Sequence, residues 1–172
     1  MHTLTELPAD KSAAYAELAR SLRALLEGER DLVANAANMA ALLFWSLRDL
    51  NWAGFYLVEP ERGDLLLGPF QGKPACVRIP VGRGVCGTTA ALRETVVVPD
   101  VHAFPGHIAC DSASNSEVVV PVIRNGTLLG VLDLDSPVRG RFDEADGRGL
   151  EALVRIFVES LGSQRSALPL RR

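Results

Sequence analysis

The sequence lacks the features that would tie it to a membrane, to nucleic acid or to an oxidising compartment. No apolar run approaches the roughly 20 residues of a membrane-spanning helix, and the first residues do not read as a secretory signal. The net charge is −3, and the absence of a Lys/Arg stripe argues against nucleic acid. Three cysteines, an odd number, do not suit a disulfide framework, so a reducing cytoplasm is the expected location.

The size and composition are those of one globular soluble domain. The chain has 172 residues, of which 48% are hydrophobic and 23% charged. No internal repeat or interdomain linker is visible. We therefore expect a single domain over residues 1–162, including N-terminal helices within residues 10–50, and a frayed tail over residues 163–172.

Hydrophobic spacing predicts helices at both ends of the chain and strands between them. Helices are expected over residues 10–27, 31–50 and 143–161, and a shorter one over 88–93 after a glycine-rich turn at 82–87. Strands are expected at 52–58, 64–70, 76–79, 95–98, 117–124 and 127–135. This order predicts an α+β fold, in which N-terminal and C-terminal helices flank a central antiparallel sheet.

A long polar loop carries a candidate nucleophile. Proline, glycine and small polar residues block helix and strand over residues 99–116, and loops of this length in compact domains are typically lids or binding loops. Cys110 lies in this loop, three residues after His107 and seven before Glu117. An accessible thiol beside ionisable groups is a candidate for nucleophilic or redox chemistry.

Cys86 is a second candidate for the reactive thiol. It lies in the glycine-rich turn, where free amide N–H groups and the dipole of the following helix would stabilise a thiolate. The residues alone leave the choice between Cys86 and Cys110 open. Cys76 has a strand-like context that suits a small buried hydrophobe. The cysteine spacings match no structural zinc pattern, and we expect no bound metal.

Two carboxylates alternate with leucines in the last predicted strand. Asp133 and Asp135 would share one face of that strand, with Leu132 and Leu134 on the other. The acidic face is either solvated or the floor of a pocket for a cationic group, with Glu117 as a third member. Crowded carboxyl groups favour keeping a proton near neutral pH. Magnesium or calcium fits less well, because no loop supplies further oxygen ligands.

Trp52 and Tyr56 share one face of the first predicted strand. Most such pairs belong to a core, but beside an acidic pocket they would form a wall against a small cationic or thioether-like ligand. His102 and His107 are expected to stabilise the loop or to be exposed. The Gly82-Arg83-Gly84 turn is too short to define a phosphate loop.

Five segments, in this order, resemble those of the free methionine-(R)-sulfoxide reductases, which are built on a GAF domain. They are residues 51–57 (NWAGFYL), 71–76 (QGKPAC), 82–87 (GRGVCG), 107–117 (HIACDSASNSE) and 130–137 (GVLDLDSP). The three cysteines together with HIACDSASNSE are specific, whereas a GAF-like pattern alone is typical of sensors. The resemblance spans roughly residues 10–162, and Arg83 stands where lysine is expected.

The resemblance implies a role for each candidate residue. Cys110 would attack the sulfoxide sulfur, Cys76 would be its resolving partner and Cys86 an auxiliary thiol. The substrate would be held by three acidic and two aromatic residues, namely Glu117, Asp133, Asp135, Trp52 and Tyr56.

The implied reaction reduces free L-methionine (R)-S-oxide to L-methionine through a sulfenic acid and a disulfide. A thioredoxin-type dithiol, supplied ultimately by NADPH, would restore the thiols without a bound cofactor, and methionine within a peptide would be excluded. A homodimer through the N-terminal helices is possible from the sequence. The alternatives are a GAF-type sensor of a small ligand, such as a cyclic nucleotide, and a redox switch in which oxidation of Cys110 alters a partner surface.

Overall fold

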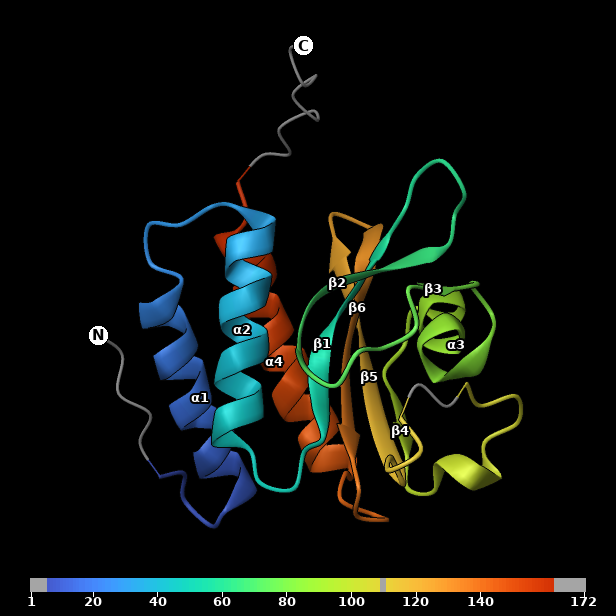
Figure 1. The fold of residues 1–172 in the computed structure, drawn as a ribbon. Helices are drawn as coiled ribbons and strands as arrows, with labels where there is room; N and C mark the ends of the chain where they lie inside the picture. The colour runs from blue at the N-terminus through green and yellow to red at the C-terminus, as the bar shows by residue number, and fades with distance from the viewer. Residues whose placement is uncertain (1–5, 109–110, 163–172) are drawn as a thin grey trace.

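The computed structural model describes residues 6–108 and 111–162. Figure 1 shows a central sheet with α1, α2 and α4 on one side and α3 on the other. Helices α1 (Lys11–Leu25) and α2 (Leu32–Ser46) each follow an aspartate, Asp10 or Asp31, whose side chain accepts a backbone N–H of the first turn. Such N-caps satisfy donors that the helix itself leaves unpaired.

Six antiparallel strands form one sheet in the order β3-β2-β1-β6-β5-β4. They are β1 (Trp52–Val58), β2 (Leu65–Gly72), β3 (Arg78–Ile79), β4 (Val96–Val98), β5 (Ser116–Arg124) and β6 (Thr127–Ser136). The predicted turn at Asn125 and Gly126 joins β5 to β6, and both residues have positive φ. The α+β class and the antiparallel sheet flanked by helices are therefore confirmed.

Alternation along the central strands separates two hydrophobic cores. Leu132 and Leu134 of β6 lie in the core shared with α1, α2 and α4, and Val131 lies in the core beneath α3. The rings of Phe55 in β1 and Phe157 in α4 (Glu144–Ser160) lie 5.0 Å apart and join the sheet to the C-terminal helix. The α3 side of the sheet therefore remains available for polar residues at the ends of the strands.

The structure differs from the prediction at the end of α2, at the start of β3 and inside the long loop. Helix α2 ends at Ser46 instead of residue 50, because Leu47 is already extended and Asp49 is left-handed with φ 61°. Strand β3 begins at Arg78, so Cys76 lies before it. The loop 99–116 contains a short 3-10 helix, η1 (Val101–Ala103), which the turn-forming residues did not reveal.

Helix α3 (Gly84–Leu92) begins four residues earlier than predicted. Gly84 starts it with φ +61°, and a side chain there would also meet Ile108 at 3.1 Å. Much of the predicted glycine-rich turn is therefore the first turn of this helix, and Cys86 lies inside it.

The described residues contain no helix with the length and apolar character required to cross a membrane. The predicted frayed tail at 163–172 lies outside the described residues.

Candidate active site

A pocket lies on the α3 side of the sheet. Its empty volume, including open solvent at the entrance, is about 510 Å³. Its walls come from β1, the segment 73–75, α3, the loop 107–114 and the ends of β5 and β6. Six residues singled out from the sequence line it: Trp52, Tyr56, Cys86, Glu117, Asp133 and Asp135. The fold therefore brings together residues that are up to 83 positions apart in the chain.

The acidic floor follows from the register of the strands. Glu117 in β5 is paired with Asp135 in β6, and Asp133 follows on the same face of β6. Glu117 and Asp133 are each only 5% exposed, and Asp135 is partly buried. The three acids therefore line a pocket, which excludes the solvated face that the sequence left open; that this floor binds a cationic group stays a prediction.

Burial raises the pKa of all three acids, and the charge of a neighbouring aspartate adds to each shift: Asp135 for Glu117 and Asp133, and Asp111 for Asp135. Burial is the main cause for Glu117 and Asp133, whose pKa values lie well above the ordinary range, and the charge of Asp135 adds to both shifts. Burial also raises the pKa of Asp135 to about 6, against a hydrogen bond from Ser114 and the charge of His107. Because the shifts share these causes, the cluster retains a proton near neutral pH.

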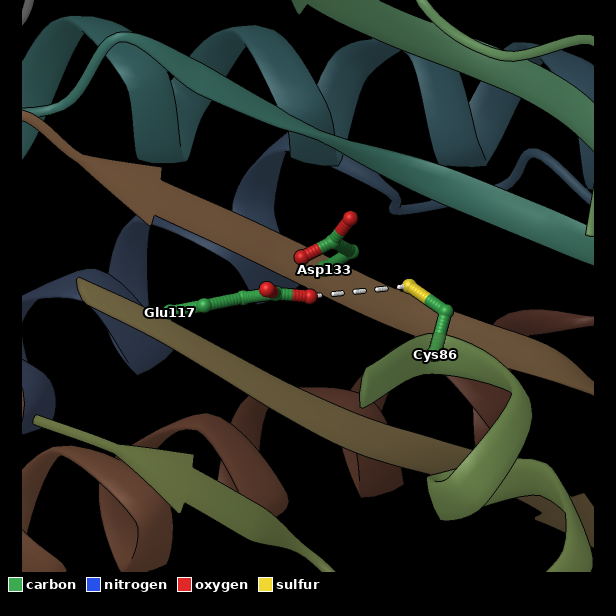
Figure 2. A group of neighbouring side chains, drawn as sticks. All are labelled: Cys86, Glu117 and Asp133. Atoms are coloured by element: carbon green, nitrogen blue, oxygen red, sulfur yellow. Dashed lines mark hydrogen bonds between the residues drawn. The ribbon is translucent and has the colours of Figure 1, made fainter. Parts of the chain in front are cut away.

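Cys86 lies over the acidic floor as a buried free thiol. Figure 2 shows its Sγ pointing from α3 toward Glu117, whose Oε1 is 4.0 Å away, with Asp133 beside them. Burial, followed by the charges of Asp133 and Glu117, raises the pKa of Cys86 well above that of an ordinary thiol. The thiolate expected from the helix dipole is therefore disfavoured, because desolvation and two nearby acids outweigh the dipole.

Trp52 and Tyr56 form the aromatic wall and hold the segment beside it. The Trp52 ring stacks on Tyr56 at 5.8 Å and on Phe70 at 5.3 Å. Its Nε1 donates to the carbonyl oxygen of Lys73 at 3.2 Å, and the Tyr56 hydroxyl donates to that of Cys76 at 3.0 Å. The polar tips of the wall therefore position the segment that ends at Cys76.

His107 lies in the pocket and not on the surface. Its side chain is 14% exposed, and its Nε2 is 3.5 Å from Oε2 of Glu117. His107 is therefore not exposed, and its contact with Glu117 ties the loop to β5. The expectation of an exposed or loop-stabilising side chain is confirmed for His102, whose Nε2 pairs with Oδ1 of Asn115 at 3.0 Å within the exposed loop.

The rim contains residues to which the sequence assigned no role. Asp111 accepts hydrogen bonds from the backbone of Ala113 at 3.0 Å and from Asn51 at 3.3 Å, and its Oδ2 is 3.2 Å from Nζ of Lys73. The bond from Ala113 is the main reason why the pKa of Asp111 lies below its usual value. Ser114 binds Asn51 at 3.0 Å beside them. These residues lie in the motif segments 51–57, 71–76 and 107–117. Membership in those motifs was the one feature of the sequence that could have identified them as site residues.

The three cysteines differ in their placement. Cys76 is in a disulfide bond, and Cys86 is free. Cys110, the predicted nucleophile, lies outside the described residues. Ile108 and Asp111, on either side of that gap, both line the pocket.

Fold and pocket together define the class of protein. The sequence profile of the GAF domain matches residues 10–164, which is nearly the whole chain. This chain folds as one such domain, with a six-stranded antiparallel sheet between helices and a pocket on one face of the sheet.

Similar sequences and structures identify one family among GAF-domain proteins. The free methionine-R-sulfoxide reductase of Escherichia coli (strain K12) is 55% identical over 145 residues, which are 84% of this chain and 87% of the relative. A protein of the same name from Saccharomyces cerevisiae is 43% identical over 157 residues, covering 88% and 87% of the two chains. The X-ray structure of the Neisseria meningitidis free methionine-R-sulfoxide reductase, in complex with its substrate, has a TM-score of 0.89 at 47% identity, covering 93% of this chain and 95% of that one. The chain belongs to the family of free methionine-R-sulfoxide reductases, as the motifs indicated.

Proposed function

We propose that this chain reduces free L-methionine (R)-S-oxide to L-methionine. The observation that carries the proposal is the buried cluster of Glu117, Asp133 and Asp135 beside an aromatic wall. The family supports it, since relatives at 55% and 43% identity carry the name of this activity.

The pocket suits a free amino acid with a sulfoxide side chain. Ionised carboxylates on the floor would hold the α-ammonium group, and Trp52 and Tyr56 would contact the methyl and methylene groups. A carboxyl that stays protonated would donate a hydrogen bond to the sulfoxide oxygen and make the sulfur electrophilic. The raised pKa values of Glu117 and Asp133 support this division of labour.

Cys110 is the proposed nucleophile. Its thiolate attacks the sulfoxide sulfur, and the oxygen passes to the cysteine sulfur as the proton arrives from the acid. L-methionine leaves, so the substrate gains two electrons and Cys110 becomes a sulfenic acid. Two observations favour this thiol: Cys86 is buried with a raised pKa, and Asp111, next to Cys110 in the chain, lines the pocket.

Cys76 is the proposed resolving thiol. It condenses with the sulfenic acid to form a disulfide and water, which completes the two-electron oxidation of the protein. The disulfide at Cys76 supports a redox role for this thiol. Cys86 then remains an auxiliary thiol in the pocket.

A thioredoxin-type dithiol, with NADPH as the ultimate electron source, is the proposed reductant. This recycling requires a reducing compartment, and the cytoplasm is the proposed location. A lone amino acid is the proposed substrate because a peptide residue lacks the free ammonium that the acidic floor would hold.

A stereochemical assay tests the proposal. Wild type with dithiothreitol should consume free (R)-sulfoxide and leave the (S) isomer and peptide-bound sulfoxide unchanged, and Cys110→Ser should be inactive. With thioredoxin in place of dithiothreitol, Cys76→Ser should stop after one turnover, whereas Cys86→Ser should continue to cycle. Normal turnover by Cys110→Ser would refute the mechanism, and consumption of neither isomer by wild type would refute the function.

A further inference from the structure

We propose that Cys86, Glu117 and Asp133 form a binding site for Zn²⁺ at the floor of the pocket. One ligand atom from each residue lies within 4.8 Å of the other two, and all three residues are buried. The residues come from α3, β5 and β6, so secondary structure holds all of them. Figure 2 shows their side chains converging on one space.

The distances are close to those of a coordinated ion. Zinc binds thiolate sulfur at about 2.3 Å and carboxylate oxygen at about 2.0–2.2 Å, so ligand atoms of a tetrahedral site lie roughly 3.3–3.7 Å apart. Sγ of Cys86 is 4.0 Å from Oε1 of Glu117. Small side-chain rotations would therefore bring the ligands to coordination distance without movement of the sheet.

Asp133 supplies an independent indication of a ligand. Its Oδ1 is buried and has no hydrogen-bond partner among the described residues, although only 5% of the residue is exposed. Buried polar atoms are nearly always satisfied, and an orphaned carboxylate oxygen is costly. A cation bound between Asp133 and Cys86 would satisfy it.

The donor set selects the ion. Magnesium and calcium bind oxygen ligands and do not take thiolate, whereas zinc accepts sulfur, carboxylate oxygen and imidazole nitrogen. His107, whose Nε2 is 3.5 Å from Oε2 of Glu117, or a water molecule can complete four-coordination. On binding, the Cys86 thiol gives its proton to solvent and a zinc–sulfur bond forms, so neither oxidant nor reductant is needed.

The charge balance also favours a dication. One thiol and two carboxyl groups lie within 4.8 Å of one another in a buried place, and three anions at that distance require a counter-charge. A zinc ion supplies that counter-charge where protons otherwise do. It would also occupy the floor that the proposed function assigns to the substrate, so cation and sulfoxide should exclude each other; this last point rests on the proposed function.

Cobalt(II), a spectroscopic substitute for zinc, provides the test. The protein is prepared with its disulfide formed, so that alkylation after unfolding counts one thiol, and cobalt is titrated under argon. One equivalent should produce a thiolate-to-cobalt charge-transfer band, which stoichiometric zinc removes. No band, or a band that persists in Cys86→Ser, would overturn the site.

The carboxylate ligands are tested by Glu117→Gln and Asp133→Asn, which should each weaken cobalt binding by at least the roughly 10- to 100-fold that loss of a hydrogen-bond partner of a ligand costs. Glu144→Gln is the control, because its side chain is 93% exposed at the start of α4. Unchanged affinity in both pocket variants would also overturn the site. If Cys86→Ser fails the check of folding by circular dichroism, these two variants decide the question.

Exclusion is tested by adding free methionine (R)-sulfoxide to the cobalt-loaded protein. The band should decline, and a band unaffected by excess sulfoxide would refute exclusion. The outcomes separate the two proposals: an intact cobalt site in a protein that reduces no sulfoxide refutes the proposed function alone. An absent cobalt site in an active reductase refutes the zinc site alone.

Discussion

Asp135 combines a partly buried position with a pKa of about 6, and this makes the pocket costly for the fold. A carboxyl whose pKa is raised in the folded state prefers to be neutral there. The cost is absent below the unfolded pKa of 3.8 and grows as the pH rises to about 6. Above that window it is on the order of 3 kcal/mol.

Asp135→Asn should therefore stabilise the protein at pH 7.5 by on the order of 3 kcal/mol while lowering its activity. The advantage should vanish near pH 4, where the wild-type carboxyl is protonated in both states. Urea denaturation at the two pH values measures the difference. Asp111→Asn is the control of opposite sign: the pKa of Asp111 is lowered, so its contribution to stability is lost as the pH falls. A stability gain that is independent of pH would contradict the assignment.

The hydroxyl of Tyr56 is expected to act on the resolving step. It donates to the carbonyl oxygen of Cys76, and losing a hydrogen bond of about 1 kcal/mol should slow disulfide formation roughly fivefold in Tyr56→Phe. Quenched-flow alkylation can separate this step from the first turnover. Tyr15→Phe is the matched control, because its hydroxyl binds Asp146 on the other side of the sheet. Equal effects of the two variants would remove the positioning role of Tyr56.

At the scale of the element, β1 depends on a residue without a side chain. A Cβ at Gly54 would lie 2.4 Å from Cβ of Phe70 and 2.6 Å from Cη2 of Trp52. Gly54 faces Asp133 in the register of β1 and β6, so its absent side chain lets the Trp52 ring lie over the strand. The packing of the Trp52 ring in the aromatic wall therefore requires glycine at position 54.

Gly54→Ala should cost about 1–3 kcal/mol of stability, because Phe70 and Trp52 must both shift. It should also weaken substrate binding through the displaced ring. The control is Gly147→Ala in α4, where the added Cβ meets Thr95 at an ordinary 3.4 Å and the helix gains a better helix former. Thermal melts and KM values report the two effects, and a neutral Gly54→Ala would show that the wall is more adaptable than its packing indicates.

Hydrophobic periodicity predicted which helices and strands exist better than it predicted where they begin and end. The bounds of β1 were predicted correctly because a regular strand stops where the turn residues begin. The start of α3 was not, since Gly84 and Gly87 are turn-like in sequence, whereas in the fold each lies where a side chain would collide with Ile108 or Pro80. Such contacts join residues distant in the chain, and local propensity does not report them.

The residues of the site likewise fall into those that periodicity predicts and those that it does not. Asp133 and Asp135 were predictable as a pair because a strand alternates its faces. Lys73 and Ser114 lie in loops that the fold brings to the rim, and a residue in a loop has no period from which its direction can be read. The burial that raises the pKa of Cys86 is likewise a property of three elements together.

At the scale of the molecule, stability and chemistry lie on opposite sides of the sheet. On the helical side, the carboxylate of Asp146, only 1% exposed, accepts hydrogen bonds from Lys11 at 2.5 Å and Tyr15 at 3.0 Å. Arg141 lies 3.4 Å from the same carboxylate. This buried network joins α1 to the first turn of α4, and none of its members lines the pocket.

Asp146→Asn should therefore lower the free energy of unfolding by about 3 kcal/mol, because it leaves the half-buried Arg141 and the more exposed Lys11 without their counter-charge, and solvent screens Lys11 in part. Its kcat and KM at a temperature below the melt should match wild type. The paired measurement is decisive, since a loss of activity in the folded variant would contradict the separation of the two sides. Lys11→Met provides a milder version of the same change.

The division of β6 into leucines and aspartates has a consequence for the fidelity of assembly. Neighbouring residues of β6 face opposite sides of the sheet. A shift of one position in its pairing would therefore place Asp133 and Asp135 in the hydrophobic core and Leu132 and Leu134 in the pocket. A misassembled chain would thus be both inert and unstable, and quality control that removes unstable chains would also remove inactive ones.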